Sequence, residues 1–170
     1  QAVQRGECGI GPITLYDPSA QKVKIAGEVK NLAFEEFIDK KELRKMDRYT
    51  QLAMVAAQEV MRSSGLDIEQ ENAARCGVLV SSGIGGLGTI ESEHTKGEEK
   101  GFDRVSPFFI PMVISNIAAG HIAIQYGFKG MCSCTVTACA SGSNAVGDSF
   151  RLIRDGYADV MLCGGAEATI

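Results

Sequence analysis

The chain lacks the features that mark a membrane protein, a polyanion binder or a disulfide scaffold. No run in its 170 residues approaches the ~20 apolar residues of a membrane span, and no signal peptide is visible. Its 17 basic and 21 acidic residues leave a net charge of −4, which argues against a general binder of polyanions. These absences lead us to expect a soluble, cytoplasmic protein.

The six cysteines also lack a pattern that would pair them or bind a metal. Most lie in apolar, strand-like segments, where a free thiol is a common small core side chain. Cys132, Cys134 and Cys139 have the spacing C-x-C-x4-C, and no other cluster of Cys or His resembles a zinc site. We expect free thiols and no metal, with a disulfide or a metal site as minor alternatives.

What remains is the composition of an ordinary globular protein, with 45% hydrophobic and 22% charged residues. The length predicts about one domain. Apolar strand-like segments alternate with helical patterns, which predicts an α/β fold with a mostly parallel sheet and flanking helices.

Individual elements can be placed on this outline. Asp39 is the expected N-cap of a helix over residues 40–64, which Gly65 ends. Residues 1–38 look irregular, apart from a possible short strand within 22–30. The remaining expected elements are buried strands at 75–82, 131–137 and 158–163, an exposed helix and loop at 91–104, and a helix at 111–126.

Cys139 is the most informative residue. It follows the strand-like segment 131–137 and precedes a helical pattern formed by Val146, Phe150 and Ile153. Strand, tight turn and helix would place Cys139 at a helix N-terminus, where the helix dipole and unpaired N–H groups favour a thiolate. The same N–H groups could stabilise an oxyanion on an acyl group attached to the sulfur. The arrangement resembles a nucleophile elbow with sulfur in place of the hydroxyl.

A second glycine-rich turn, GIGGLG at residues 83–88, follows the expected strand 75–82. As letters it matches the GxGxxG pattern of dinucleotide-binding proteins. No acidic residue follows at the end of a second strand in the expected context, since Asp103 lies in a loop pattern. Close backbone packing near a channel or interface is therefore the favoured interpretation, and nucleotide binding is the alternative.

Three apolar strands make a thin sheet whose edges would stay exposed. After Gly164 and Gly165 the chain stops without a cap or a polar tail, and it does not begin with Met. From this pattern we expect a fragment of a longer protein.

Several stretches together resemble the N-terminal half of an elongating β-ketoacyl-acyl-carrier-protein synthase (type II), of the thiolase-like superfamily. They are GECGIGPITLYD, SSGIGGLGTIE, SPFFIPMVISNIAAGHIAIQYGFKG and TACASGSNAVGDSFRLIRDGYADVMLCGGAEA, and their order runs the length of the chain. The resemblance implies that residues 1–170 form half of a two-fold repeated, layered thiolase-like fold, without its first strand and its C-terminal half.

The resemblance also implies an activity, the decarboxylative Claisen condensation of fatty-acid elongation. Cys139 would carry the acyl group as a thioester, and its own backbone N–H would be one oxyanion donor. The catalytic histidines, the active-site lysine and the second oxyanion donor of this family belong to the C-terminal half. The chain alone is therefore expected to be inactive in condensation.

Other roles are implied by the same resemblance. Ile84 and Phe109 match residues of the acyl-chain pocket, with Phe109 reaching across a homodimer interface. A basic patch that receives the acidic acyl carrier protein is matched by Lys41, Arg44, Lys45 and Arg104, and Asp103 weakens that patch. No cofactor is implied, because phosphopantetheine arrives on the carrier protein.

Plainer interpretations remain beside these roles. His94 and His121 match no catalytic position and are expected to be a surface and a core or interface residue. Phe109 alone would suggest plain core, and the basic residues a solvated helix face. A polyketide-type condensing relative, a non-catalytic dimerisation scaffold and a nucleotide-binding module remain the alternative functions.

Overall fold

The computed structural model describes residues 2–170, which divide into two compact units. The first unit comprises the chain up to Ala33 together with Ile170, and the second runs from Phe34 to Thr169.

The first unit contains a two-stranded antiparallel sheet. Strand β1 (Ile10–Pro12) pairs with β2 (Ile25–Gly27), and a short 3-10 turn, η1 (Val3–Arg5), precedes them. The expected strand within residues 22–30 is therefore present as β2, whereas the expectation of an irregular segment was wrong for β1.

A single carboxylate ties the two strands of this unit together. Glu28 accepts hydrogen bonds from the backbone N–H groups of Thr14 (2.9 Å) and Leu15 (3.2 Å) and from the Thr14 hydroxyl (2.9 Å). The bond from the Thr14 N–H is the main reason that the pKa of Glu28 falls to about 2, because it stabilises the ionised carboxylate.

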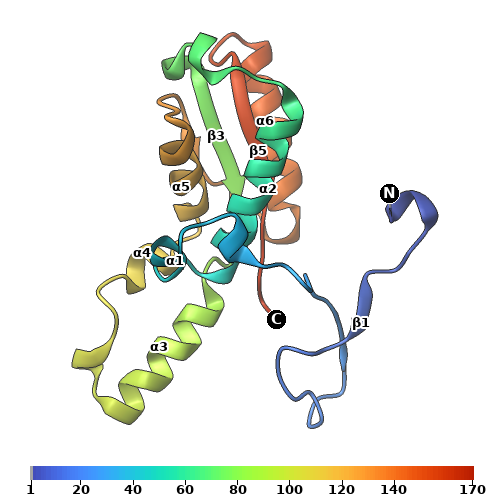
Figure 1. The fold of residues 1–170 in the computed structure, drawn as a ribbon, viewed down its shortest axis with the longest axis vertical. Helices are drawn as coiled ribbons and strands as arrows, with labels where there is room; N and C mark the ends of the chain where they lie inside the picture. Colours follow the sequence, from blue (N-terminus) through green and yellow to red (C-terminus); the bar gives the residue numbers. More distant parts are fainter. Residues whose placement is uncertain (1) are drawn as a thin grey trace. The chain divides into compact units, whose positions relative to one another are not determined.

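The second unit is built around a three-stranded parallel sheet of order β4-β3-β5. Its strands are β3 (Cys76–Ser81), β4 (Cys132–Ser133) and β5 (Val160–Gly165). The central strand β3 is buried along its whole length, as expected for a strand covered on both faces. The sheet, drawn between helices in Figure 1, confirms the expected α/β class with flanking helices.

Two of the three expected strands are confirmed, and the third was largely wrong. Only residues 132 and 133 of the expected strand 131–137 belong to the sheet. Beyond them the backbone N–H of Thr135 donates to the Oγ of Ser81 (3.0 Å) rather than to a backbone carbonyl. A side chain at the end of β3 thus replaces the ladder and leads the chain out of the sheet.

An ion pair joins the beginnings of β3 and β5. The Arg75 guanidinium donates to the Asp159 carboxylate (Nη2 to Oδ1, 2.7 Å) and to the carbonyl oxygen of Gly156 (3.0 Å). The hydrogen bond from Arg75 lowers the pKa of Asp159. This contact lies at the edge of the sheet opposite to the carboxyl ends of the strands.

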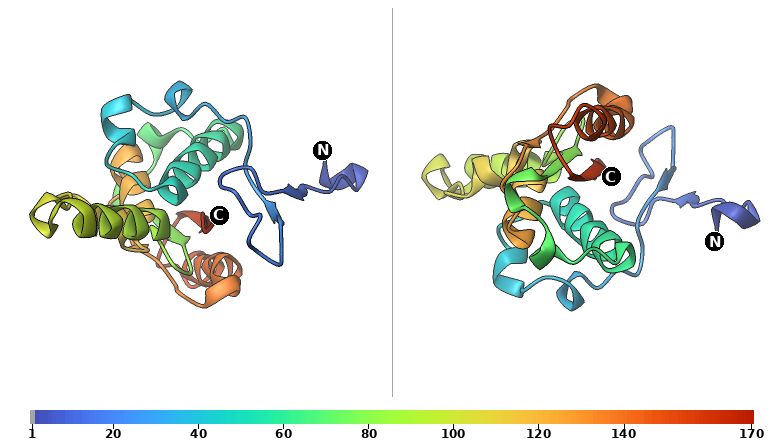
Figure 2. Two further views of the ribbon diagram at one scale, coloured as in Figure 1. Left: turned by 90° about the horizontal axis from the view of Figure 1, so that it is seen from below. Right: turned by 90° about the horizontal axis from the view of Figure 1, so that it is seen from above.

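Helices cover both faces of the sheet. Figure 2 shows α6 on one side, and α2 and α5 on the other. No helix within residues 2–170 is both long and apolar enough to cross a membrane. The helices are α1 (Lys40–Leu43), α2 (Arg48–Ser64), α3 (Leu87–Lys100), α4 (Phe109–Val113), α5 (Ile117–Tyr126) and α6 (Ser141–Arg154).

Short 3-10 turns connect these elements. They are η2 (Phe34–Glu36), η3 (Ile68–Gln70), η4 (Ala73–Arg75), η5 (Phe102–Arg104) and η6 (Ala138–Ala140).

The expected helix over residues 40–64 is two helices, because Asp47 starts a new one. Asp39 caps α1 as expected, and Gly65 ends α2 in the left-handed conformation. Between them the buried carboxylate of Asp47 accepts from the N–H of Tyr49 (3.2 Å), as an N-cap does. Its other oxygen accepts from the N–H (2.9 Å) and hydroxyl (2.7 Å) of Thr89 in the first turn of α3.

The expected helix over residues 111–126 is also divided, at Ile114. The chain is extended there, and the Ile114 carbonyl accepts from the Tyr49 hydroxyl (2.6 Å). Tyr49 is fully buried, and this burial raises the pKa of its phenol to about 12. Helix α3 also differs from expectation, since it begins at Leu87, inside the glycine-rich turn.

Helix α6 confirms the predicted helical spacing but uses a different face. Val146, Phe150 and Ile153 are all exposed, whereas its buried positions are the small residues Ser141, Ala145 and Ser149. Small side chains let the helix axis approach the sheet closely, and a Cβ on Gly165 would lie 3.0 Å from the Cα of Gly142.

Candidate active site

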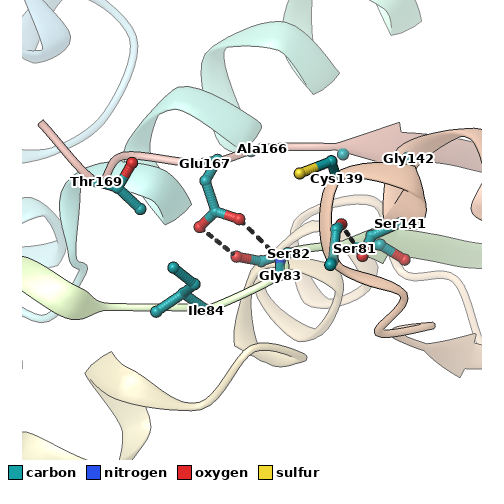
Figure 3. Close-up of a pocket in the computed structure, with 12 residues that line it drawn as sticks. Ser81, Ser82, Gly83, Ile84, Cys139, Ser141, Gly142, Ala166, Glu167 and Thr169 are labelled. Atoms are coloured by element: carbon teal, nitrogen blue, oxygen red, sulfur yellow. Dashed lines mark hydrogen bonds between the residues drawn. The ribbon is translucent and has the colours of Figure 1, made fainter.

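A cavity of about 500 Å³ opens where the carboxyl ends of β3 and β5 meet the beginning of α6. This is the edge at which open α/β sheets bind ligands. Figure 3 shows its lining. The lining residues are Ser81, Ser82, Gly83, Ile84, Ala138, Cys139, Ser141, Gly142, Gly165, Ala166, Glu167 and Thr169.

Cys139 lies in η6, immediately before α6, as the sequence predicted. Its thiol is exposed, and its sulfur points into the cavity on the side of Glu167 (Figure 3). Its backbone N–H makes no hydrogen bond to another part of the described chain. An exposed thiol in the cavity and an unbonded backbone N–H therefore belong to the same residue, just before the N-terminus of a 14-residue helix.

The turn that carries Cys139 is backbone-strained. Ala138 has a φ of 51°, in the left-handed region that alanine disfavours. Ser141, one turn further on, accepts from the Thr137 N–H (2.9 Å) and donates to the Ala138 carbonyl (2.7 Å) through its hydroxyl.

Glu167 joins two walls of the cavity. Its carboxylate accepts from the Ser82 hydroxyl (3.0 Å) and from the backbone N–H of Gly83 (2.8 Å), as the dashed lines of Figure 3 show. It lies just after the end of β5, so it connects the end of that strand to the end of β3. Sequence reasoning assigned no role to Glu167, Ser141 or Ser81, although a carboxylate just after a parallel strand is a usable signal for the first.

The glycine-rich turn has a different role from the one its letters suggest. Most of its backbone donors are already bonded within the protein, and the Asp47 carboxylate occupies the N-terminus of α3. The bonds run from Gly83 N–H to Glu167, from Gly85 N–H to Ser82 Oγ (2.9 Å), from Gly86 N–H to the Val113 carbonyl (3.0 Å) and from Leu87 N–H to the Gly85 carbonyl (3.0 Å).

Close packing explains the glycines of this turn. A Cβ on Gly85, which has a φ of +80°, would overlap the carbonyl oxygen of Val113, and one on Gly86 would lie 2.5 Å from that of Met112. With most of its donors used and a carboxylate at the helix end, the turn does not cradle a phosphate. The geometry supports the close-packing interpretation and gives the nucleotide-binding alternative no site.

The structure brings one of the two predicted pocket residues to the cavity. Ile84 lines it, with its side chain half exposed. Phe109, the first residue of α4, is half-buried outside this lining. Its reach into a partner's pocket stays a prediction.

The predicted basic patch is divided. Lys41, on α1, and Arg44, just after it, are exposed. Lys45 forms an ion pair with Glu42 (2.8 Å). Arg104 lies in η5, which follows the far end of α3, and Figure 1 draws that end of α3 well away from α1.

Neither histidine lines the cavity. His94 is exposed on α3, with its ring 6.2 Å from that of Phe102. His121 is half-buried on α5, and burial lowers its pKa. All six cysteines are free, and no group of three or more potential ligands within residues 2–170 could hold a metal ion.

Comparison with known proteins decides the family. Residues 1–170 match the family described as "Beta-ketoacyl synthase, N-terminal domain". The chain belongs to the beta-ketoacyl synthase family. It is 49% identical over 170 residues to 3-oxoacyl-[acyl-carrier-protein] synthase 2 of Synechocystis sp., and 48% identical over 166 residues to the protein of that name from Staphylococcus aureus. These alignments cover 100% and 98% of this chain but 41% of each relative.

Solved structures of ketosynthases share the fold. The ishigamide ketosynthase/chain length factor matches with a TM-score of 0.86 and 26% identity, over 99% of this chain and 42% of its own. A beta-ketoacyl synthase from Burkholderia phymatum matches with a TM-score of 0.82 and 24% identity, over 99% and 42%. The thiolase-like α/β architecture expected from the sequence is thereby confirmed.

Proposed function

We propose that this chain provides the acyl-carrying part of the active site of a β-ketoacyl-acyl-carrier-protein synthase that elongates fatty acids. One observation carries the proposal: the exposed thiol of Cys139 lines a cavity at the N-terminus of α6, and the backbone N–H of the same residue is unbonded. A thioester carbonyl on this sulfur would place its developing oxyanion near that N–H.

The proposed reaction has two stages. In the first, the Cys139 thiolate attacks the acyl thioester of the carrier protein, and the phosphopantetheine sulfur leaves as a thiolate, which takes a proton from water. In the second, the carboxylate carbon of malonyl-carrier protein leaves as carbon dioxide, and its bonding electrons form an enolate. The enolate carbon then attacks the Cys139 thioester, a carbon–carbon bond forms, and the cysteine sulfur is released.

The residues of this chain account for the first stage only. Neither His94 nor His121 reaches the cavity, so no imidazole within residues 2–170 is placed to stabilise the enolate. The resemblance to condensing enzymes assigns that task to residues outside this chain. We therefore expect residues 1–170 alone to accept an acyl group at most, and not to condense.

The same proposal includes the partners. Acyl carrier protein would dock on Lys41, Arg44 and Lys45, where exposed cations can steer an acidic partner. A similar structure, with a TM-score of 0.75 and 25% identity over 82% of this chain and 40% of its own, is a type II PKS acyl-carrier protein in complex with its ketosynthase. We further propose a cytoplasmic homodimer in which Phe109 reaches the partner's acyl pocket.

Thiol alkylation tests the central assignment. Limiting iodoacetamide is added to the natural protein that contains residues 1–170. The adducts are then mapped by mass spectrometry. Cys139 is expected to react faster than Cys8, which is also exposed. Equal alkylation rates at Cys139 and Cys8 would contradict the assignment. In a separate assay, Cys139→Ala should abolish acyl transfer from acyl-carrier protein.

A polyketide-type condensing enzyme is the second candidate, because two of the similar structures are described as PKS or chain-length-factor proteins. Their identities of 25% and 26% are well below the 49% and 48% of the fatty-acid synthases. A chain-length factor would lack the nucleophile, which is present here. Preference for saturated acyl primers over β-ketoacyl primers in a condensation assay distinguishes the two enzymes.

A non-catalytic scaffold predicts a third pattern. Such a protein would dimerise on size exclusion, would not bind carrier protein, and would show an unreactive Cys139.

A further inference from the structure

The strained residue Ala138 directly precedes the proposed nucleophile. Within residues 2–170, Ala138 and Asn31 are the only non-glycine residues with a positive φ. Asparagine tolerates this region, whereas alanine resists it because its Cβ approaches the following carbonyl oxygen. Something in the surrounding structure must therefore hold Ala138 in place.

The hydroxyl of Ser141 is placed to do so. It bonds the chain on both sides of Ala138, accepting from the Thr137 N–H (2.9 Å) and donating to the Ala138 carbonyl (2.7 Å). Ser141 is only 3% exposed, so water cannot readily replace these bonds. Its backbone N–H also donates to the Ala138 carbonyl.

The approach to this turn is held by a second buried hydroxyl. Ser81, at the end of β3, accepts from the Thr135 N–H (3.0 Å). The Ser81 bond fixes where the chain leaves the sheet. The Ser141 bonds fix the backbone at Thr137 and Ala138, the two residues that precede Cys139.

We propose that Ser141 is a positioning residue for Cys139. Its hydroxyl locks the left-handed turn at Ala138, and that turn directs the sulfur and the backbone N–H of Cys139 into the cavity. The inference rests on the proposed function for the identity of the nucleophile, but the lock itself is a property of the turn.

The test compares Ser141→Ala with a matched control, Ser149→Ala. Ser149 lies on the same helix, is 2% exposed and has no hydrogen-bond partner for its hydroxyl, so its loss removes a buried hydroxyl without touching the turn. Ser141→Ala is expected to lower the alkylation rate of Cys139 by about tenfold or more, as misplaced reacting groups do. Ser149→Ala should leave that rate within about twofold, because the near-attack geometry of Cys139 is unchanged.

A second substitution separates positioning from general damage. Glycine adopts the left-handed region freely, so Ala138→Gly added to Ser141→Ala should restore most of the Cys139 rate. If Ser141→Ala is too unstable to assay, the same rescue is measured as recovery of folded protein by circular dichroism.

Two comparisons keep the outcomes distinct. The proposed function is judged in the wild-type protein, by Cys139 against Cys8. The positioning role of Ser141 is judged by the alkylation rate of Cys139 in each variant against wild type. An unchanged rate in Ser141→Ala overturns it, and so does a double variant in which Ala138→Gly fails to restore the rate.

Discussion

Two strand-to-helix junctions of the second unit are both rich in small residues and have opposite chemistry. The junction from β3 to α3 contains GIGGLG, and the one from β4 to α6 contains TACASG. Both follow a parallel strand, and both begin a 14-residue helix. In the first, neighbouring groups occupy the backbone donors and the helix end, whereas the second leaves a thiol and an N–H open.

The difference lies in what packs against each turn. Carbonyls from α4 and the buried Asp47 carboxylate lie against the glycine junction. The cysteine junction is held by the buried hydroxyls of Ser81 and Ser141, and Cys139 lines the cavity. A glycine-rich turn at a helix N-terminus is thus a site only where tertiary contacts leave its donors free.

The largest effect is expected from breaking the packing of the glycine junction. Gly85→Ala should destabilise the protein by about 3 kcal/mol or more, because a left-handed alanine costs roughly 1–2 kcal/mol and overpacking roughly 1–3 kcal/mol. Urea unfolding measures the loss. Gly88→Ala is the control, since its Cβ would meet only Asp47 Oδ2 at 3.8 Å; a comparable loss there would contradict the packing explanation.

Removing the carboxylate at the same junction should cost somewhat less. Asp47→Ala is expected to destabilise the protein by about 2–3 kcal/mol, because it removes an N-cap of α2 and two bonds to Thr89. Asp67, which caps the exposed turn η3 through Glu69 N–H, provides the comparison. Its replacement by alanine should cost about 0.5–1 kcal/mol by the same unfolding assay, as exposed caps do; equal losses would refute a special role for Asp47.

The contact between Glu167, just after β5, and the glycine junction should have a smaller effect. Glu167→Ala leaves the Gly83 N–H without an acceptor and is expected to cost about 1 kcal/mol. Amide hydrogen exchange at Gly83 should become faster in this variant. Glu167→Gln, which keeps an acceptor oxygen, should restore slow exchange, and no recovery would show that the bond to Gly83 is not what protects the amide.

The last effect is absent at neutral pH and appears only at alkaline pH. The pKa of Tyr49 is about 12 in the folded protein against 10.0 for the free side chain. Below pH 10 the phenol is neutral in both states, and its contribution to stability is complete. Between pH 10 and 12 the unfolded chain loses this proton while the folded protein keeps it, so stability falls as pH rises. Tyr49→Phe should remove this component of the decline, and an unchanged profile would contradict it.

The local elements were largely predictable because short-range chemistry determines them. The cap at Asp39, the end at Gly65 and the apolar strand β3 are each encoded within a few residues. The breaks at Asp47 and Ile114 were not predictable, since their partners, Thr89 and Tyr49, lie 42 and 65 residues away in the chain.

The candidate site divides in the same way. Cys139 could be identified from its position between a strand and a helix, and Ile84 from the resemblance. Glu167 and Ser141 could not be identified, because a carboxylate or hydroxyl acquires a role only through the groups it meets in the fold.

By itself, the sequence determined the α/β class, the order of its elements and the placement of a cysteine at the start of α6. Only the tertiary structure decided which of the two glycine- and alanine-rich turns is open to a ligand. The reason is physical: hydrophobic periodicity and capping act locally, whereas the satisfaction of backbone donors depends on distant groups such as Asp47, Val113 and Glu167.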